Sequence, residues 1–407
     1  MWLYKNHYKL RDEPTSQQQR IFLQGTDVGL LARKLFGSGA DASPTDVFHY
    51  RESVRDTARL IAEGHTVIFE AAFQYEGVLC AVDILIKHRD KWYAYEVKSS
   101  TGLKDQFIQD AALQYYVISN AGLDLEDIFI VHINTGYVRL GDLQLKKLFT
   151  KHSVKEQVIE KQPSISAKAG ELKLITVQKQ MPNISIGLQC NLPYTCDFYG
   201  FCHQEDPIFQ NNIPNVLELV EADNKISYLE RPVNFLYIGT YRAAVPEYDG
   251  HWPYRHIPFQ FSFINLNNAA QIEEHFVAQY GSDPVIQFVE QFKKILQNST
   301  GQIIVRNKIF ITSRINELQK DYPNYSADLE LIKIRLFEIS IKTNYPLQAF
   351  IGNDTKDESI IIETEEDAAA VWYNYRHLAI QNNNQVMSLI KFGVSRLKLL
   401  LNLVSTL

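Results

Sequence analysis

Hydrophobic and polar positions follow their clearest pattern between residues 67 and 120. Three mostly apolar runs predict β-strands; they are residues 67–73, 78–86 and 91–97. Turn-forming residues at 75–77 and charged residues at 87–90 separate the runs. A helical period follows at about residues 105–120. This order predicts a sheet of consecutive strands followed by a helix.

Two helices are predicted upstream of these strands. The first covers residues 26–35 and the second covers residues 45–63, with Thr45 or Asp46 as its N-cap. The apolar stripe of the second helix comprises Val54, Ala58 and Ile61.

Further elements are predicted downstream. Strands are expected at residues 128–133 and 137–140, and a long polar helix at 150–180 with breaks at Pro163 and Gly170. In the second half, strands are expected at 234–239, 259–264 and 303–306, and helices at 283–297 and 366–375. The pattern predicts an α/β protein with a mixed sheet flanked by helices. Its predicted parts are a first domain at 1–205, a linker at 206–230 and a second domain at 231–407.

Two carboxylates inside the apolar runs suggest metal chemistry. Asp83 and Glu96 lie in neighbouring strands, and Lys98 follows two residues after Glu96, so strand alternation directs Glu96 and Lys98 to one face. Converging carboxylates can hold Mg²⁺ or Mn²⁺, and the backbone carbonyl of Val97 would add a ligand. Lys98 would then orient or deprotonate a water, or stabilise charge on a phosphate. The alternative is an exposed edge strand, in which Glu-x-Lys is a common sequence.

These residues resemble a known family. Asp83, the Glu96-Val97-Lys98 run and a helix carrying Gln114 resemble the PD-(D/E)XK nuclease superfamily, in its RecB-like branch, which includes CRISPR-adaptation exonucleases. The segments EAAFQYEGVL, DILI, WYAYEVKSS and LKDQFIQDAALQYYVI are similar to an uncharacterised bacterial family. In that family a RecB-like module precedes an RNase H-like, DnaQ-type exonuclease module. The resemblance implies a restriction-endonuclease-like mixed sheet flanked by helices, followed by an RNase H-like α/β domain.

The resemblance assigns roles to individual residues of the first module. It implies that Asp83 and Glu96 bind the metal and that Lys98 is the catalytic lysine. Glu70 corresponds to an upstream acid that is a third metal ligand or orders the site; a charge at a strand end is the alternative. No histidine lies at residues 25–36, where RecB-like members often carry a metal-binding histidine.

The DNA-positioning motif of the family is only partly present. Gln114 corresponds to the glutamine of a Q-x-x-x-Y motif, but Ile118 occupies the tyrosine position. Tyr115 and Tyr116 lie nearby, and each is either a DNA contact or a core aromatic. Gln114, Tyr115 and Lys104 are therefore the candidate nucleic-acid contacts.

Composition and charge restrict how nucleic acid would bind. The chain has 407 residues, 45% of them hydrophobic and 22% charged, which is ordinary for a globular protein of two or three domains. The net charge is -6, so binding of DNA, with single-stranded DNA as the expected partner, requires a local basic patch. The candidates near the proposed site are Lys87, His88, Arg89, Lys98 and Lys104; a solvated loop is the alternative for the first three.

The N-terminal residues lack the apolar region of a signal peptide, and no run approaches a membrane span, so a cytoplasmic location without membrane contact is expected.

Three evenly spaced cysteines form a second candidate site. Five residues separate Cys190 from Cys196 and Cys196 from Cys202, a spacing that favours iron–sulfur or zinc binding. Three reduced cysteines without metal are the alternative. In RecB-like relatives such a trio and an N-terminal cysteine hold a [4Fe-4S] cluster, so the resemblance implies a cluster here with an uncertain fourth ligand. Cys80 is expected to be buried packing, and His203 has unsuitable geometry beside Cys202.

The second module lacks the acids that its family needs. DnaQ-type chemistry uses four acids to hold two metals. Positions that correspond to those acids carry Tyr237, Gly239, Ile311 and Arg396. The resemblance therefore implies a catalytically inactive RNase H-like domain with a structural or binding role.

Two functions follow from these observations. The first is a metal-dependent DNA nuclease, an exonuclease on single-stranded or unwound DNA, that uses Asp83, Glu96 and Lys98. The second is a nucleic-acid-binding or scaffold protein that retains the nuclease fold without activity.

Overall fold

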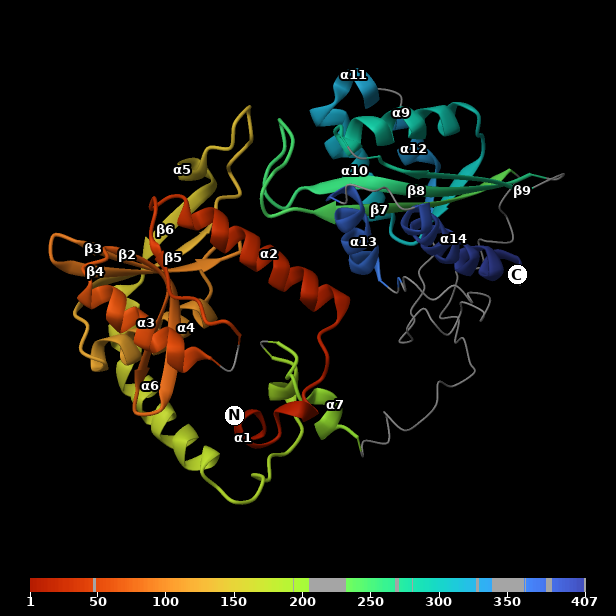
Figure 1. The fold of residues 1–407 in the computed structure, drawn as a ribbon. Coiled ribbons are helices and arrows are strands. Elements are labelled where there is room, and N and C mark those ends of the chain that lie inside the picture. The colour runs from red at the N-terminus through yellow and green to blue at the C-terminus, as the bar shows by residue number, and fades with distance from the viewer. Residues whose placement is uncertain are drawn as a thin grey trace. The chain divides into compact units, whose positions relative to one another are not determined.

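The chain forms two compact units (Figure 1). The computed structural model describes residues 1–46, 49–192, 194–204, 232–267, 271–279, 281–326, 329–338, 362, 364–377 and 383–405. Unit 1 comprises Met1–Gln210 and Ala244–Tyr254, and unit 2 comprises Asn211–Ala243 and Arg255–Leu407. The predicted linker at 206–230 lies entirely outside the described residues.

Unit 1 contains a six-stranded sheet whose strands follow one another in chain order. The strands are β1 (Ala40–Asp41), β2 (Val67–Tyr75), β3 (Val78–His88), β4 (Lys91–Lys98), β5 (Leu125–Ile133) and β6 (Phe149–Ser153). β2, β3 and β4 pair antiparallel, and β6 pairs antiparallel with β5, whereas β1–β2 and β4–β5 are parallel pairs. The predicted strands at 67–73, 78–86, 91–97 and 128–133 are confirmed.

Helices cover both faces of this sheet (Figure 1). The helices of unit 1 are α1 (Trp2–Asn6), α2 (Ser16–Arg33), α3 (Tyr50–Ala62), α4 (Asp105–Asn120), α5 (Leu145–Leu148), α6 (Lys155–Thr176) and α7 (Tyr199–Cys202). Residues of α3, α4 and α6 share one apolar core with the sheet. On the other face, Val28 and Ala32 of α2 pack with Val131 and Ile133 of β5. Strand alternation explains these two cores, because successive side chains of a strand point to opposite faces.

Two upstream helices differ from the sequence prediction. α2 begins ten residues before residue 26, because Thr15 and Gln18 form a capping box that starts the helix there. α3 is capped at His49, and it buries Ser53, Thr57 and Leu60, not the predicted stripe of Val54, Ala58 and Ile61. The predicted face was wrong because the buried hydroxyls bond backbone groups: Ser53 donates to Ala42 O, and Thr57 Oγ1 accepts from Ala72 N at 2.9 Å.

Two downstream predictions are also corrected. Residues 137–140 form no strand; Tyr137 is buried in the core under α2, and β6 pairs with β5 in their place. α6 starts only at Lys155 and continues through Pro163 without a break. Its packing against α4 compensates for the backbone hydrogen bond that proline cannot donate.

Unit 2 contains a five-stranded mixed sheet in the order β11-β10-β7-β8-β9. The strands are β7 (Val233–Arg242), β8 (His256–Leu266), β9 (Gln271–Val277), β10 (Gln302–Val305) and β11 (Leu336–Glu338). β7, β8 and β9 are antiparallel neighbours, whereas β10 runs parallel to both β7 and β11. The predicted strands at 234–239, 259–264 and 303–306 are confirmed, and β9 and β11 are additional strands.

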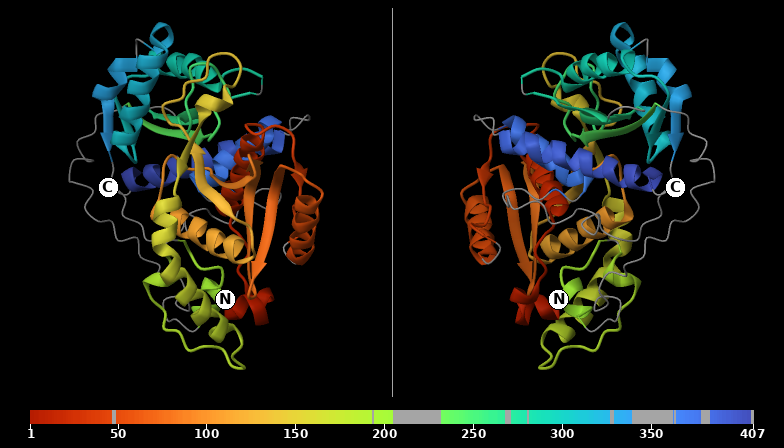
Figure 2. Two further views of the ribbon diagram at one scale, coloured as in Figure 1. Left: turned by 90° about the vertical axis from the view of Figure 1, so that its left-hand side faces the viewer. Right: turned by 90° about the vertical axis from the view of Figure 1, so that its right-hand side faces the viewer.

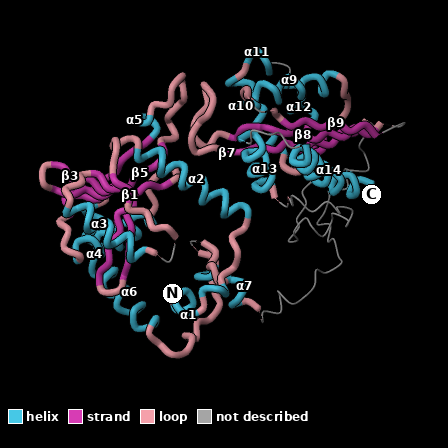
Figure 3. Tube along the Cα trace, in the orientation of Figure 1, coloured by secondary structure: helices cyan, strands magenta, loops and turns pink. Residues whose placement is uncertain are grey.

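The helices of unit 2 flank its sheet, as Figures 1 and 2 show. They are α9 (Pro284–Gln297), α10 (Lys308–Asp321), α11 (Pro323–Ser326), α12 (Glu330–Arg335), α13 (Glu365–His377) and α14 (Asn383–Ser405). Phe259, Phe261 and Phe288 are fully buried in the core, where Trp372 of α13 stacks on Phe259 with ring centroids 4.9 Å apart. The α/β prediction is thus confirmed as two mixed sheets flanked by helices (Figure 3). Among the described residues, none of the helices combines the length and apolar character that crossing a membrane requires.

Candidate functional site

Three carboxylates of unit 1 form a row across three neighbouring strands. The backbone pairs Phe69–Ile84 and Ala71–Val82 place Glu70 of β2 opposite Asp83 of β3. The pair Ile84–Tyr95 is the last between β3 and β4, and one residue further the same register brings Asp83 opposite Glu96. We call Glu70, Asp83 and Glu96 the acidic row. The row unites the two carboxylates that the sequence predicts to bind metal with the upstream acid that the family resemblance implies.

Glu70 has a backbone conformation that is rare within a strand. Its φ is 52°, in the left-handed region that residues with a side chain seldom occupy. Ile68 and Ala71 on either side both face the core under α4, although three-residue spacing in a regular strand would put them on opposite faces. Glu70 is therefore a point of backbone strain at which β2 changes the direction of its side chains, while its register with β3 stays the same on both sides. Such strain concentrates at functional sites, where the surrounding structure holds it in place.

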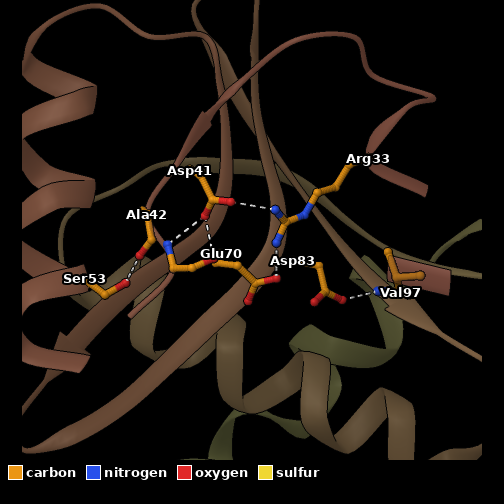
Figure 4. Close-up of polar contacts among 8 residues, drawn as sticks. Arg33, Asp41, Ala42, Ser53, Glu70, Asp83 and Val97 are labelled. Carbon is orange, nitrogen blue, oxygen red and sulfur yellow. Dashed lines mark hydrogen bonds and ion pairs between the residues drawn. The ribbon is translucent and has the colours of Figure 1, made fainter. Parts of the chain in front are cut away.

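Asp83 lies where β4 separates from β3. Val97 N–H donates a 2.6 Å hydrogen bond to Asp83 Oδ2 instead of to a backbone carbonyl of β3 (Figure 4). The carboxylate thus replaces a backbone acceptor at the end of the antiparallel ladder. This bond gives Val97 a role that the sequence did not predict, because its amide, and not its carbonyl, contacts the acidic row.

Glu96 and Lys98 both face α4, as strand alternation predicts. Lys98 Nζ lies 2.7 Å from Glu96 Oε1 and 2.6 Å from Asp110 Oδ2 of α4. Gln114 Nε2 donates to Glu96 Oε2 at 2.7 Å and to Ala81 O at 3.0 Å. The sequence analysis missed Asp110, although its spacing of four residues from Gln114 places both on one helix face.

Arg33 of α2 holds the other end of the acidic row. Its Nη2 lies 2.7 Å from Glu70 Oε1, and its Nη1 lies 2.8 Å from Asp41 Oδ2 (Figure 4). Figure 4 also shows Asp83 beside Glu70 on the side away from Asp41. Arg33 lies within residues 25–36, the segment that carries no histidine, and its contact with Glu70 was not predicted from the sequence. The row therefore has a cation from α2 at one end and Lys98 at the other.

Burial and mutual repulsion govern the protonation of the acidic row. Burial raises the pKa of Asp83 well above its usual range, and the nearby carboxylates of Glu96 and Glu70 raise it further. Burial also raises the pKa of Glu96, although Lys98 opposes that shift. For Lys98 itself, burial disfavours the charge, but the carboxylates of Glu96 and Asp110 outweigh burial and raise its pKa. Lys98 is consequently a stable cation, which favours charge stabilisation over proton abstraction among its expected roles.

The donor atoms of the row suit a hard divalent cation, which prefers carboxylate oxygens. The raised pKa of Asp83 shows that ionised carboxylates repel one another in the row, and a bound cation would neutralise that repulsion. Nevertheless, no group of three or more His, Cys, Asp or Glu side chains in the described part of the chain is arranged to hold a metal ion. At this site both oxygens of Glu96 already accept hydrogen bonds from protein groups, Lys98 and Gln114. The carboxylate oxygens of the row are suitable ligands for such an ion. To bind it, Glu96 must give up its hydrogen bond to Lys98 or to Gln114.

The predicted nucleic-acid contacts lie around α4 with different exposures. Gln114 is only 4% exposed and holds Glu96, so its amide serves the acidic row. Tyr115 is partly buried against the core. Lys104 lies at the N-cap of α4, with its Nζ 5.6 Å from the centre of the Phe107 ring. Lys104 is thus the most accessible of the three.

The cysteine trio lies in a segment that the N-terminal residues hold in place. Asp12 N–H donates to Asp197 O at 2.7 Å, and Asp12 Oδ2 accepts from Gly200 N at 2.8 Å. Burial raises the pKa of the Cys202 thiol, and the nearby Cys196 and Cys190 raise it further. Cys196 N–H donates to Cys190 O at 2.8 Å, but among the described residues the three thiols are not arranged as a group that could hold a metal ion.

A fourth cysteine ligand is not at hand for this trio. Cys80 is 8% exposed within the sheet core, as expected from the sequence, and does not join the three. His203 is buried against Tyr199, with the rings 3.8 Å apart. A [4Fe-4S] cluster held by four thiolates therefore does not fit the described residues.

Two of the positions in unit 2 that the family resemblance assigns to acids, Tyr237 and Arg396, lie near each other. The Arg396 side chain lies over Phe392, whose ring contacts that of Tyr237 edge-on with centroids 5.8 Å apart. Arg396 also pairs with Glu365 at 2.9 Å. Burial raises the pKa of Tyr237, and the nearby Glu365 carboxylate raises it further. Glu365 is thus an acid near Tyr237 that was not predicted from the sequence, and Arg396 already neutralises it.

Comparisons with known proteins give little functional information. A family model described as a domain of unknown function (DUF2779) matches residues 235–348. No curated protein matches the chain. One similar solved structure is the foamy viral protease-reverse transcriptase in complex with an RNA/DNA hybrid, at 13% identity and a TM-score of 0.16. The match covers 59% of this chain and 40% of that chain, and at this TM-score it carries no argument.

Removing the Asp83 charge should stabilise the protein. A carboxyl whose folded pKa exceeds its unfolded value destabilises the fold when ionised, so the penalty is full above the folded pKa and absent below the unfolded pKa. Asp83→Asn keeps an oxygen acceptor for Val97 N–H. At pH 7 we expect the variant to be more stable than the parent, and to lose this advantage as the pH falls toward the unfolded pKa of about 4.

Urea unfolding of unit 1 at several pH values measures this difference. Asp142→Asn, which removes the same charge from an exposed position, is the matched control and should leave stability nearly unchanged. An Asp83→Asn protein that is less stable than the parent at pH 7 would contradict the repulsion.

Proposed function

We propose that unit 1 is a RecB-like PD-(D/E)XK nuclease that hydrolyses phosphodiester bonds of DNA in the cytoplasm, as an exonuclease on single-stranded or unwound strands. The observation that carries the proposal is the acidic row on three adjacent strands, with protonated Lys98 bound to its last member. Ordinary structural ion pairs seldom crowd three carboxylates, and perturbed carboxyl pKa values in such a group are typical of catalytic sites.

The residues of the site have separate roles in this mechanism. A bound Mg²⁺ or Mn²⁺ would activate a water and polarise a phosphoryl oxygen. Asp83 and Glu96 would hold the ion, with Glu70 as the third acid. Lys98, kept charged by Glu96 and Asp110, would stabilise negative charge that develops on the scissile phosphate.

Two further residues position the acids. Gln114 fixes the Glu96 carboxylate through one oxygen, and Arg33 fixes Glu70 against its strained backbone. Both are positioning residues because their hydrogen bonds end on the acids.

Unit 2 has a different part in this proposal. It would be a degenerate RNase H-like domain, because Tyr237, Gly239, Ile311 and Arg396 occupy the positions of its metal-binding acids. Its mixed five-stranded sheet with flanking helices supports this assignment. The domain would contribute structure or binding, and every cleavage event would occur in unit 1.

A scaffold without activity is the second candidate, and one observation favours it. Arg33 and Lys98 already neutralise the ends of the acidic row, and both Glu96 oxygens are bonded within the protein. A closed network of this kind is stable without metal. Measured cleavage decides between the two candidates.

The nuclease proposal predicts degradation of end-labelled single-stranded DNA in Mg²⁺ or Mn²⁺, and none in EDTA. Lys98→Ala should reduce kcat by roughly a hundredfold or more, because it removes the cation beside the phosphate. Lys91→Ala, which removes an exposed lysine paired with Asp124, should cleave normally.

Two outcomes would contradict this account. A parent protein that cleaves no nucleic acid favours the scaffold. Activity that survives in the Glu96→Ala, Lys98→Ala double variant would move catalysis to unit 2.

The cysteine trio is proposed to bind iron, as a cluster with a non-cysteine fourth ligand, or zinc. Full-length protein purified without oxygen should contain one of these metals, and should be brown if the metal is an iron–sulfur cluster. Cys196→Ser should lose the metal, whereas Cys80→Ala should keep it because Cys80 lies in the sheet core. Elemental analysis is the measurement, and colourless parent protein without iron or zinc would reject the site.

A further inference from the structure

A groove on unit 1 gathers positive charge away from the acidic row. Its volume is about 520 Å³, and it is open to solvent. The lining residues come from the end of β5, the connection through α5 and the start of β6; they are Asn134, Gly136, Tyr137, Val138, Lys146, Lys147, Phe149, Thr150 and Lys151. Three lysines and no acidic residue belong to this lining. We call it the lysine groove.

This charge is concentrated on a protein whose net charge is -6. Lys151 Nζ lies 4.1 Å from the centre of the Phe36 ring and 5.4 Å from that of Tyr95. Burial lowers the pKa of Lys151, and repulsion by Lys146 lowers it further. Positive charges that repel one another in a groove without a lining carboxylate favour a bound anion.

The groove is built from ordered parts of the chain. Asn134 Nδ2 donates to Lys147 O at 2.9 Å, and its Oδ1 accepts from Gly136 N at 3.0 Å, which fixes the connection between β5 and β6. Tyr137 and Phe149 are buried under it, at 4% and 6% exposure. The lysines therefore extend from a rigid base, while Lys146 and Lys147 remain exposed to a ligand.

The sheet register relates the groove to the acidic row. Lys98 of β4 pairs with His132 of β5, and His132 pairs with Thr150 of β6, which lines the groove. Two strand spacings of about 4.8 Å put the backbones of Lys98 and Thr150 roughly 10 Å apart. Both lie at the same end of the sheet, where β4 and β5 finish and β6 begins. Lys151 lies on the α2 face of the sheet, over Tyr95, whereas Lys98 lies on the α4 face, so a strand of nucleic acid that reaches both passes around this end of the sheet.

We infer that the lysine groove binds the phosphate backbone of a single-stranded nucleic acid a few nucleotides from the phosphate that reaches the acidic row. This inference deepens the proposed nuclease function and rests on it. Lys146, Lys147 and Lys151 would neutralise successive phosphates, while the Thr150 hydroxyl supplies a further donor. Such contacts are independent of sequence and depend strongly on salt.

Binding is tested with the full chain carrying Lys98→Ala, so that the DNA stays intact. Fluorescence anisotropy of a labelled oligothymidine follows affinity at several salt concentrations. Lys146→Ser, Lys147→Ser and Lys151→Ser combined should weaken binding at least tenfold. The slope of log affinity against log salt should fall by about 2, the value for three phosphate contacts at about 0.7 each on a single strand.

Two control proteins isolate the position of the charge. Lys5→Ser, Lys9→Ser and Lys179→Ser combined remove the same charge from exposed lysines outside the groove, and should bind like the parent. Replacement of the three groove lysines by arginine keeps the charge and should retain binding. Equal DNA affinity of the groove variant and the control variant would overturn the inference. A parent protein that binds anionic phospholipid vesicles through the groove lysines, but does not bind DNA, would overturn it as well.

A second arm separates this inference from the nuclease proposal. With Lys98 intact, the groove variant should cleave with a raised KM and an unchanged kcat, because the groove lies away from the reacting atoms. Cleavage with an unchanged KM would overturn the groove and leave the nuclease intact. If the parent protein cleaves no DNA and the groove variant alone loses DNA binding, the result would support the groove and reject the nuclease.

Discussion

Repulsion among the three carboxylates of the acidic row is the constraint on which the site in unit 1 depends. Strand pairing places Glu70, Asp83 and Glu96 side by side, and burial denies Asp83 and Glu96 the screening that water would provide. The protein tolerates this arrangement through a cation at each end, Arg33 and Lys98. Asp83 lies in the middle of the row. In the described structure its side chain accepts a hydrogen bond only from the Val97 amide, and its pKa is raised well above its usual range. A divalent cation in this position would relieve the cost directly.

The fold delivers those two cations from opposite faces of one sheet. α2 brings Arg33 over the strained Glu70, and α4 brings Asp110 and Gln114 to Lys98 and Glu96. The strained backbone at Glu70 and the separation of β4 from β3 after Tyr95 interrupt the regular sheet at the row. The apolar cores on the two faces hold these departures from regular geometry in place. The site is therefore a product of both helix layers as well as of the strands.

Much of this arrangement follows from local sequence patterns, and the remainder depends on tertiary contacts. Alternation along residues 91–97 correctly placed Glu96 and Lys98 on one face, because a strand side chain has only two directions available. Arg33 was missed because its partner lies 37 residues away, in a helix whose start is set by the Thr15 capping box. The buried face of α3 was misjudged because Ser53 and Thr57 are buried through hydrogen bonds that hydrophobicity does not reveal. The lysine groove likewise forms only when β5 and β6 pair.

The central claim is that the acidic row binds a divalent cation, and calorimetric titration of Mn²⁺ into the full-length protein tests it most directly. The account predicts one site that Asp83→Asn and Glu96→Gln each weaken at least tenfold, since each removes a charged oxygen ligand. Lys98→Ala should bind Mn²⁺ at least as tightly as the parent, because Lys98 competes with the ion for Glu96. Absence of Mn²⁺ binding, or binding that both acid variants leave unchanged, would contradict the account.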